Sequence, residues 1–234
     1  MKSWHVVAIA VALVIALQQG APHLLPGRLP DMVELDDPPG FRAVPRAATS
    51  PGSAIFAGLD PATAVPEVQG DFCQALFPPA DTGVPVAYFL DYNCPYCREL
   101  SRILAQTDGI TLRRHWLSGL GSSSLTAARA AVAAESLGVG DAMYARLSRS
   151  VVVANAGYLR ALAEGIGIDP DQLIAAMTSP QTDAALENSA ALARRFALPG
   201  TPALVVGRTL VVGEIDANTL DTLVAHEAAA QRPC

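Results

Sequence analysis

The chain has 234 residues, enough for one domain with a substantial core plus extensions, or for two small domains. Hydrophobic residues make up 51% of it and charged residues 16%, which excludes a chain that is disordered throughout. The formal net charge of −6, without any visible cluster of Lys and Arg, excludes a nucleic-acid-binding surface.

Residues 1–20 are predicted to be a signal peptide or a signal anchor. Lys2 precedes the uncharged run Val6–Leu17, which has the length of a signal-peptide core and is shorter than the roughly 20 apolar residues of a full membrane span. The letters that follow, LQQGAPH, hold no clear cleavage site, so removal and retention as a membrane tether both remain open. Both predict a periplasmic or otherwise extracytoplasmic protein, anchored to the inner membrane in the second case.

Residues 21–70 are dense in Pro and Gly and show no sustained period of two or 3.6 residues. We expect a linker or a poorly ordered arm here. Order is expected to begin near Asp71, so that residues 71–234 form the folded domain.

The domain is predicted to open with a strand, a helix and a second strand. Val84–Leu90 is a continuous apolar run, the pattern of a strand buried on both faces. A helix then starts at Cys94, because Pro95 suits a first-turn position and apolar residues follow at helical spacing. Ile110–Trp116 can form a second strand, parallel to the first.

A helical block is expected at about residues 118–197. Its clearest start signals are Asp169 and Ser179, each a capping residue followed directly by Pro. Two short apolar runs around a Gly-Arg turn then predict a hairpin over residues 203–212. Asp216 is expected to cap a final amphipathic helix.

The motif FLDYNCPYCREL places Cys94 and Cys97 at the junction between the first strand and its helix. The unpaired N–H groups and positive end of a helix N-terminus favour a thiolate at Cys94, and the thiolate is the form that attacks a disulfide. Cys97 lies one turn further along, where it can reach Cys94 without movement of the backbone. The spacing therefore predicts that Cys94 is the nucleophile and Cys97 the resolving thiol.

The alternatives for this pair are a structural disulfide and half of a zinc site. Zinc requires further ligands, and the other cysteines and the four histidines form no second closely spaced pair, so we predict no metal. Cys73 and Cys234 either form a structural disulfide between the two ends of the domain or remain independent thiols. His115 is expected to be a structural histidine in its strand.

A second motif, LPGTPALVVG, lies after the helical block. Pro202 immediately precedes a buried strand, where the Thr201–Pro202 bond is a candidate for the cis form. The two motifs, in this order, resemble the DsbA-like branch of the thioredoxin superfamily over roughly Cys73 to Ala229. The resemblance implies an α/β thioredoxin fold with an inserted helical domain. It also implies that Thr201 and Pro202 lie beside the cysteine pair and hold the substrate backbone.

Two residues of the first motif leave the chemistry open. The most oxidising members of that family carry His before the second cysteine, where this chain has Tyr96, so the direction of electron flow is not predicted. Tyr96 either contacts substrate or packs at the rim of the site. Asp91 lies three residues before Cys94, and it either relays protons or raises the thiol pKa, or else acts as a cap or faces solvent.

These features together predict an exported thiol–disulfide oxidoreductase that exchanges disulfides with protein substrates. Its partners would be polypeptides with thiols or disulfides and a second redox protein, with no nucleic acid and no cofactor. A disulfide isomerase or reductase of the same fold is the nearer alternative. A non-catalytic peptide-binding chaperone is the further one.

Overall fold

The computed structural model describes residues 29, 31–44, 67–79, 82–149, 152, 155–230 and 234. Its strands are β1 (Val33–Glu34), β2 (Arg42–Ala43), β3 (Val84–Leu90), β4 (Ile110–Trp116), β5 (Ala203–Val206) and β6 (Thr209–Val212). Its helices are α2 (Phe72–Leu76), α3 (Pro95–Leu104), α4 (Ser122–Ser136), α5 (Gly140–Leu147), α6 (Ala156–Gly165), α7 (Pro170–Met177), α8 (Pro180–Arg195) and α9 (Ala217–Ala230).

The strands form one mixed sheet in the order β1-β2-β6-β5-β3-β4. β3 and β4 are parallel and are joined through α3, as the sequence predicts. β5 runs antiparallel to β3, and β5 and β6 form the predicted hairpin around Gly207. Gly207 has φ +54°, in the left-handed region that favours glycine.

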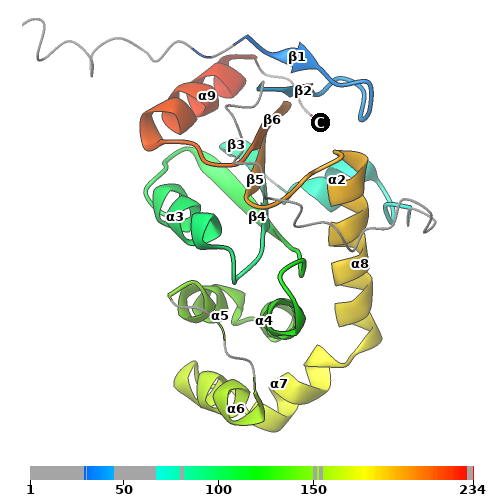
Figure 1. Ribbon diagram of the computed structural model, residues 1–234, viewed down its shortest axis with the longest axis vertical. Coiled ribbons are helices and arrows are strands. Elements are labelled where there is room, and N and C mark those ends of the chain that lie inside the picture. The colour runs from blue at the N-terminus through cyan, green and yellow to red at the C-terminus, as the bar shows by residue number, and fades with distance from the viewer. Residues whose placement is uncertain are drawn as a thin grey trace, which may run out of the picture.

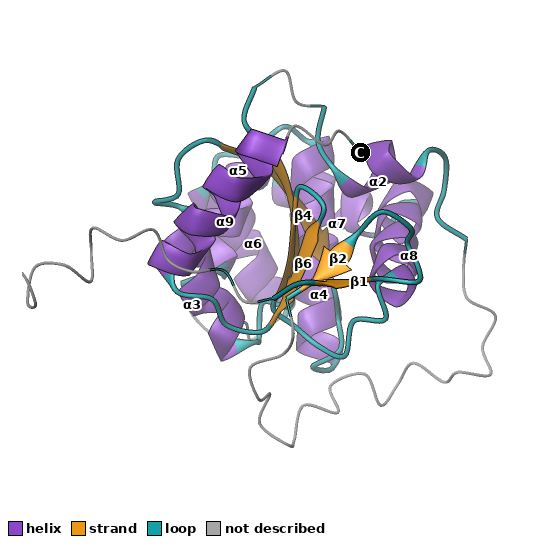
Figure 2. Ribbon diagram, turned by 90° about the horizontal axis from the view of Figure 1, so that it is seen from above, coloured by secondary structure: helices purple, strands orange, loops and turns teal. Residues whose placement is uncertain are grey.

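Alternation along β3 divides the core between the two faces of the sheet. Val86, Tyr88 and Leu90 face the cluster that includes α3, α9 and the inserted helices. Ala87 and Phe89 face a second cluster, which includes residues of α2 and α8. Viewed from above in Figure 2, the sheet is nearly edge-on, with α3 and α9 on one side and α2 and α8 on the other.

Helices α4 to α8 all lie between β4 and β5 in sequence, and α4 to α7 lie beyond one end of the sheet (Figure 1). The predicted cap residues Asp169 and Ser179 begin α7 and α8, where their side chains accept hydrogen bonds from backbone N–H groups of the first turn. The inserted helices α4 to α8 therefore leave β3, α3 and β5 adjacent. The cysteine motif and the Thr-Pro motif meet at this place.

Within residues 21–70, the expectation of a linker or arm is wrong for the stretch that includes β1 and β2. β1 pairs with β2, and β2 pairs in parallel with β6 at the end of the sheet. Phe41 is 2% exposed and packs edge-on against Phe72 and Phe196. The strands are stabilised by long-range backbone pairing and one aromatic anchor, neither of which leaves a periodic pattern in the sequence.

A disulfide joins Cys73 on α2 to Cys234 beyond α9, with the two Cα atoms 5.5 Å apart. Of the two alternatives that the sequence leaves open for these residues, the structure has the bonded one. The bond connects positions 161 residues apart, so it ties the helix before β3 to the end of the domain.

The predicted signal or anchor at residues 1–20 lies outside the described residues. In the part of the chain that the structure describes, no helix combines the length and the apolar composition needed to cross a bilayer.

Candidate active site

Cys94 and Cys97 lie where β3 passes into α3, as the motif predicts. Cys94 is the N-cap residue of α3 and Pro95 occupies its first turn. The Cys94 N–H donates to the carbonyl of Asp91 at 3.0 Å, which closes the short loop between the strand and the helix. Both cysteines are free thiols and both are buried.

The two sulfur atoms have opposite ionisation tendencies. A hydrogen bond from Cys97 is the largest cause that lowers the pKa of Cys94 to about 6, and backbone N–H groups of the first turn add to it. Burial and the neighbouring Cys94 sulfur raise the pKa of Cys97 far above its ordinary value. At neutral pH the favoured reduced state is therefore a Cys94 thiolate that accepts a hydrogen bond from a Cys97 thiol.

The Thr-Pro motif lies against Cys94. The Thr201–Pro202 peptide bond is cis, in agreement with the sequence expectation, and the Cys94 Sγ lies 3.4 Å from the Thr201 carbonyl oxygen. Thr201 Oγ1 is buried and has no hydrogen-bond partner among the described residues. The structure thus brings Cys94, Cys97, Thr201 and Pro202 together, although Cys94 and Thr201 are 107 positions apart in the sequence.

Tyr96 lies at the surface beside the pair and is 49% exposed, one of the few large hydrophobic side chains left open to solvent among the described residues. A protruding aromatic ring next to a reactive thiol suits contact with a second molecule.

Asp91 is 1% exposed, so of the alternatives that the sequence leaves open for it, the solvent-facing one is excluded. Its carboxylate accepts hydrogen bonds from the N–H groups of Asn93 and Leu120 and from the Ser124 hydroxyl. Asn93 extends this network, because its amide oxygen accepts the Val152 N–H. Asp91 therefore ties the cysteine loop to the inserted helices, while its role as a proton relay stays a prediction.

His115 has the structural role that the sequence suggests. It stacks on Phe89 with ring centroids 4.8 Å apart, and its Nε2 lies 2.9 Å from the Leu76 carbonyl oxygen. Burial lowers the pKa of His115 to about 4, so the ring is neutral over the physiological range.

Three residues near Cys97 were not predicted from the sequence: Tyr88, Ser101 and Tyr144. Their hydroxyls form a connected set that ends on the Cys97 carbonyl. The only sequence signal is Tyr88 within an apolar strand, since a buried tyrosine hydroxyl usually requires a hydrogen-bond partner.

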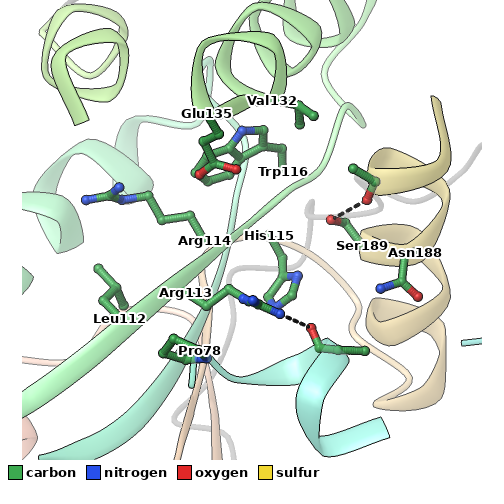
Figure 3. A pocket seen from close by; sticks show the side chains of 12 residues that line it. Pro78, Leu112, Arg113, Arg114, His115, Trp116, Val132, Glu135, Asn188 and Ser189 are labelled. Atoms are coloured by element: carbon green, nitrogen blue, oxygen red, sulfur yellow. Dashed lines mark hydrogen bonds between the residues drawn. The ribbon is translucent and has the colours of Figure 1, made fainter. Parts of the chain in front are cut away.

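A pocket of about 380 Å³ lies elsewhere, along β4 between α4 and α8 (Figure 3). Leu112 to Trp116 line one side of it, and Glu135 and Asn188 lie across from them. Neither cysteine of the motif lines this pocket, so it is separate from the thiol chemistry. Among the described residues there is no cluster of three or more His, Cys, Asp or Glu side chains arranged to hold a metal ion.

Comparison with models of known protein families identifies one family that the chain matches. A family model described as a DSBA-like thioredoxin domain matches residues 98–225, more than half of the chain. The match begins directly after Cys97, so the cysteine pair itself lies outside the matched region. No curated protein sequence matches the chain.

Comparison with solved structures supports the same family. A thioredoxin-like oxidoreductase from Silicibacter pomeroyi DSS-3 is 30% identical with a TM-score of 0.59, over 67% of this chain and 97% of that one. The thiol-disulfide exchange protein alpha-DsbA2 from Wolbachia pipientis is 28% identical with a TM-score of 0.57, over 64% and 83%. ScsC from Proteus mirabilis in a compact conformation is 25% identical with a TM-score of 0.54, over 62% and 82%. The chain therefore belongs to the DsbA-like family of the thioredoxin superfamily, and it is a thiol–disulfide oxidoreductase of that kind.

Proposed function

We propose that Cys94 and Cys97 are the redox pair of this oxidoreductase and that it exchanges disulfides with polypeptide substrates outside the cytoplasm. The single observation that carries the proposal is the setting of Cys94. It lies at a helix N-terminus, beside the cis-proline loop and next to a protonated Cys97, and its pKa is lowered to about 6.

In the oxidising direction, a substrate thiolate attacks the Cys94 Sγ of the Cys94–Cys97 disulfide. The sulfur–sulfur bond breaks, its electron pair stays on Cys97, and Cys97 takes up a proton. A second substrate thiolate then attacks the substrate sulfur of the mixed disulfide and releases the Cys94 thiolate. The substrate loses two electrons, which the pair gains and later passes to a second redox protein.

The direction of net electron flow depends on how strongly the Cys94 thiolate is stabilised. Reference values run from about 3.5 for a strongly oxidising member of the fold to about 7 for a reducing one, and the lowered pKa of Cys94 lies within this range. Because only the reduced form contains this thiolate, a smaller stabilisation makes the pair a weaker oxidant. The reduction potential of the pair, measured against glutathione, distinguishes an oxidant from the isomerase or reductase alternative.

Substrate binding is assigned to Tyr96, Thr201 and Pro202. The exposed ring of Tyr96 offers apolar contact, and Thr201 lies beside the Cys94 sulfur, where a substrate would form its mixed disulfide. Pro202 directly precedes β5, so a bound segment would lie next to the reactive sulfur.

Export is proposed from two features. The apolar run near the N-terminus has the length of a signal-peptide core. The Cys73–Cys234 disulfide requires an oxidising compartment to persist. A retained anchor and a cleaved signal would both bring the domain there, and mass determination of the mature protein distinguishes them.

The deciding experiment is a trapping measurement with Cys97→Ser in the full chain. Without the resolving thiol, Cys94 should accumulate mixed disulfides with exported proteins, seen as adducts that disappear on reduction. The matched control is Cys94→Ser combined with Cys97→Ser, which should trap nothing. Absence of adducts from Cys97→Ser would refute the assignment of the pair.

The chaperone alternative makes a different prediction. A peptide-binding protein without thiol chemistry would retain its cellular function in Cys94→Ser. The proposed enzyme would lose both insulin reduction and substrate oxidation in that variant.

A further inference from the structure

Three hydroxyl groups from three elements form a hydrogen-bonded chain that ends on the carbonyl of Cys97. Tyr88 on β3 and Ser101 on α3 each donate a hydrogen bond to this oxygen at 2.7 Å. Tyr144 on α5 donates to the Ser101 hydroxyl at 2.6 Å, and the Tyr88 hydroxyl lies 3.3 Å from that of Ser101. The first turn of the active-site helix is thereby connected to the inserted helical domain.

Both tyrosines remain hydrogen-bond donors while the thiols titrate. Burial raises the pKa of Tyr88 well above its ordinary value, and the neighbouring Cys97 adds to the effect. Burial also raises the pKa of Tyr144. Neither hydroxyl becomes a phenolate near neutral pH, so each keeps a partially positive hydrogen directed along the chain.

Tyr144 is held in place by a residue of β4. The Arg114 guanidinium carbon lies 3.9 Å from the centroid of the Tyr144 ring, and Arg114 Nη1 lies 2.7 Å from an Asp141 carboxylate oxygen on the same helix. The guanidinium therefore contacts both the ring and the start of α5. These contacts hold the Tyr144 hydroxyl where it donates to Ser101.

We propose that Tyr88, Ser101 and Tyr144 form a positioning chain through which the inserted helices stabilise the Cys94 thiolate. The hydroxyls fix the orientation of Cys97 through its carbonyl, and a fixed Cys97 keeps its S–H directed at Cys94. They also offset the negative end of that carbonyl dipole, close to two sulfur atoms in a buried site where such charges act strongly. The other charged or titratable groups near this turn include Tyr96, Arg98 and Glu99 on α3, Asp91 before it, and Arg114 against Tyr144.

The test is a pH titration of Cys94 in reduced Tyr144→Phe. The ultraviolet absorbance of the thiolate measures its ionisation. Tyr144 touches neither sulfur, yet loss of its hydroxyl should raise the pKa of Cys94 by roughly half a unit. The equilibrium with glutathione at neutral pH should move about threefold toward the oxidised protein, because the reduced form loses part of its stabilisation.

Three further variants separate this role from plain packing. Ser101→Ala should match Tyr144→Phe, whereas Ser101→Thr should restore the wild-type value, since a threonine hydroxyl in a helix can bond the carbonyl four residues earlier. Tyr158→Phe on α6 makes the same chemical change on a partly buried tyrosine outside the chain, and should leave the titration unchanged.

The inference rests on the proposed role of the cysteine pair, but the two fail differently. A wild-type Cys94 with an ordinary thiol pKa would overturn both. A lowered wild-type pKa that Tyr144→Phe and Ser101→Ala leave unchanged, with or without a lower melting temperature, would overturn the positioning chain alone.

Discussion

Cys94 and Cys97 carry identical side chains, but their surroundings shift the two thiol pKa values in opposite directions. Cys94 occupies the N-cap, where backbone N–H groups and the Cys97 thiol favour its charged form. Cys97 lies one turn deeper, where burial disfavours charge. The positions of the two cysteines along α3 therefore determine which thiol ionises more readily.

This asymmetry predicts the pH dependence of alkylation. In the reduced protein, the rate of Cys94 modification by iodoacetamide should rise as pH increases through about 6 and then level off, since the thiolate is the reacting species. Cys97→Ala removes the hydrogen bond that is the largest cause of the lowered pKa, so its midpoint should move toward the ordinary thiol value near 9. Equal midpoints in the two proteins would contradict this account.

A second residue-level prediction concerns Asp91. Asp91→Asn keeps the shape of the side chain but weakens bonds to the Asn93 and Leu120 N–H groups and to the Ser124 hydroxyl. We expect a loss of about 1–3 kcal/mol in the free energy of unfolding, measured by urea titration. If Asp91 also relays protons, resolution by Cys97 should slow by more than the alkylation of Cys94 does, and stopped-flow kinetics separate the two steps.

At the scale of elements, an ion pair with a buried carboxylate adds to the backbone pairing that joins β2 to the rest of the sheet. Arg42 Nη2 lies 2.6 Å from Glu227 Oε1 on α9, and the Glu227 side chain is 2% exposed. Arg42 also donates to the Thr209 hydroxyl on β6, and the Arg208 N–H donates to the same carboxylate. Burial opposes ionisation of Glu227, but these donors outweigh it and hold its pKa below the usual range.

Arg42→Ala should therefore destabilise the protein by roughly 2–4 kcal/mol, because it leaves the buried carboxylate without its cationic partner. Urea unfolding gives the total loss, and hydrogen exchange should show it first at β2. The matched control is Arg102→Ala, which breaks the exposed Arg102–Glu99 pair and should cost under about 0.5 kcal/mol. Similar losses in both variants would contradict a special role for the buried pair.

The same carboxylate predicts how this contribution depends on pH. Since the pKa of Glu227 is lowered on folding, its stabilisation is present above the ordinary value of 4.5 and is lost as pH falls below it. The difference in unfolding free energy between wild type and Glu227→Gln should accordingly shrink from pH 6 toward pH 3. A difference that stays constant over this range would exclude the linkage.

Which elements the sequence can predict depends on where their stabilising contacts lie. β3, α3 and the β5–β6 hairpin carry apolar runs, a proline at the helix start and a glycine turn, all of them local signals. β1 and β2 have two residues each, and their pairing with a distant strand leaves no local pattern. The same holds for the candidate site. Two local motifs predict the cysteines and Pro202, whereas the hydroxyls of Tyr88, Ser101 and Tyr144 come together only through tertiary packing, which no local pattern predicts.

At the scale of the whole molecule, the thiol pair lies at the junction between the sheet and the inserted helices, and the Cys73–Cys234 disulfide ties α2 to the end of the chain beyond α9. Substituting Ser for both of these cysteines should lower the unfolding free energy by about 2–5 kcal/mol, measured by denaturant titration under non-reducing conditions. The Cys94–Cys97 reduction potential should stay at its wild-type value. A shifted potential would reveal coupling between the two pairs that no described contact provides.

The order of cysteines along the chain also bears on how this protein is made. In the proposed export, which begins at the N-terminus, Cys73, Cys94 and Cys97 would all emerge before Cys234, the partner of Cys73 in the folded structure. Early oxidation would then pair Cys73 with Cys94 or Cys97, the proposed redox pair, before Cys234 is available. A catalyst of disulfide exchange with this connectivity would itself need disulfide exchange before it reaches its folded pairing.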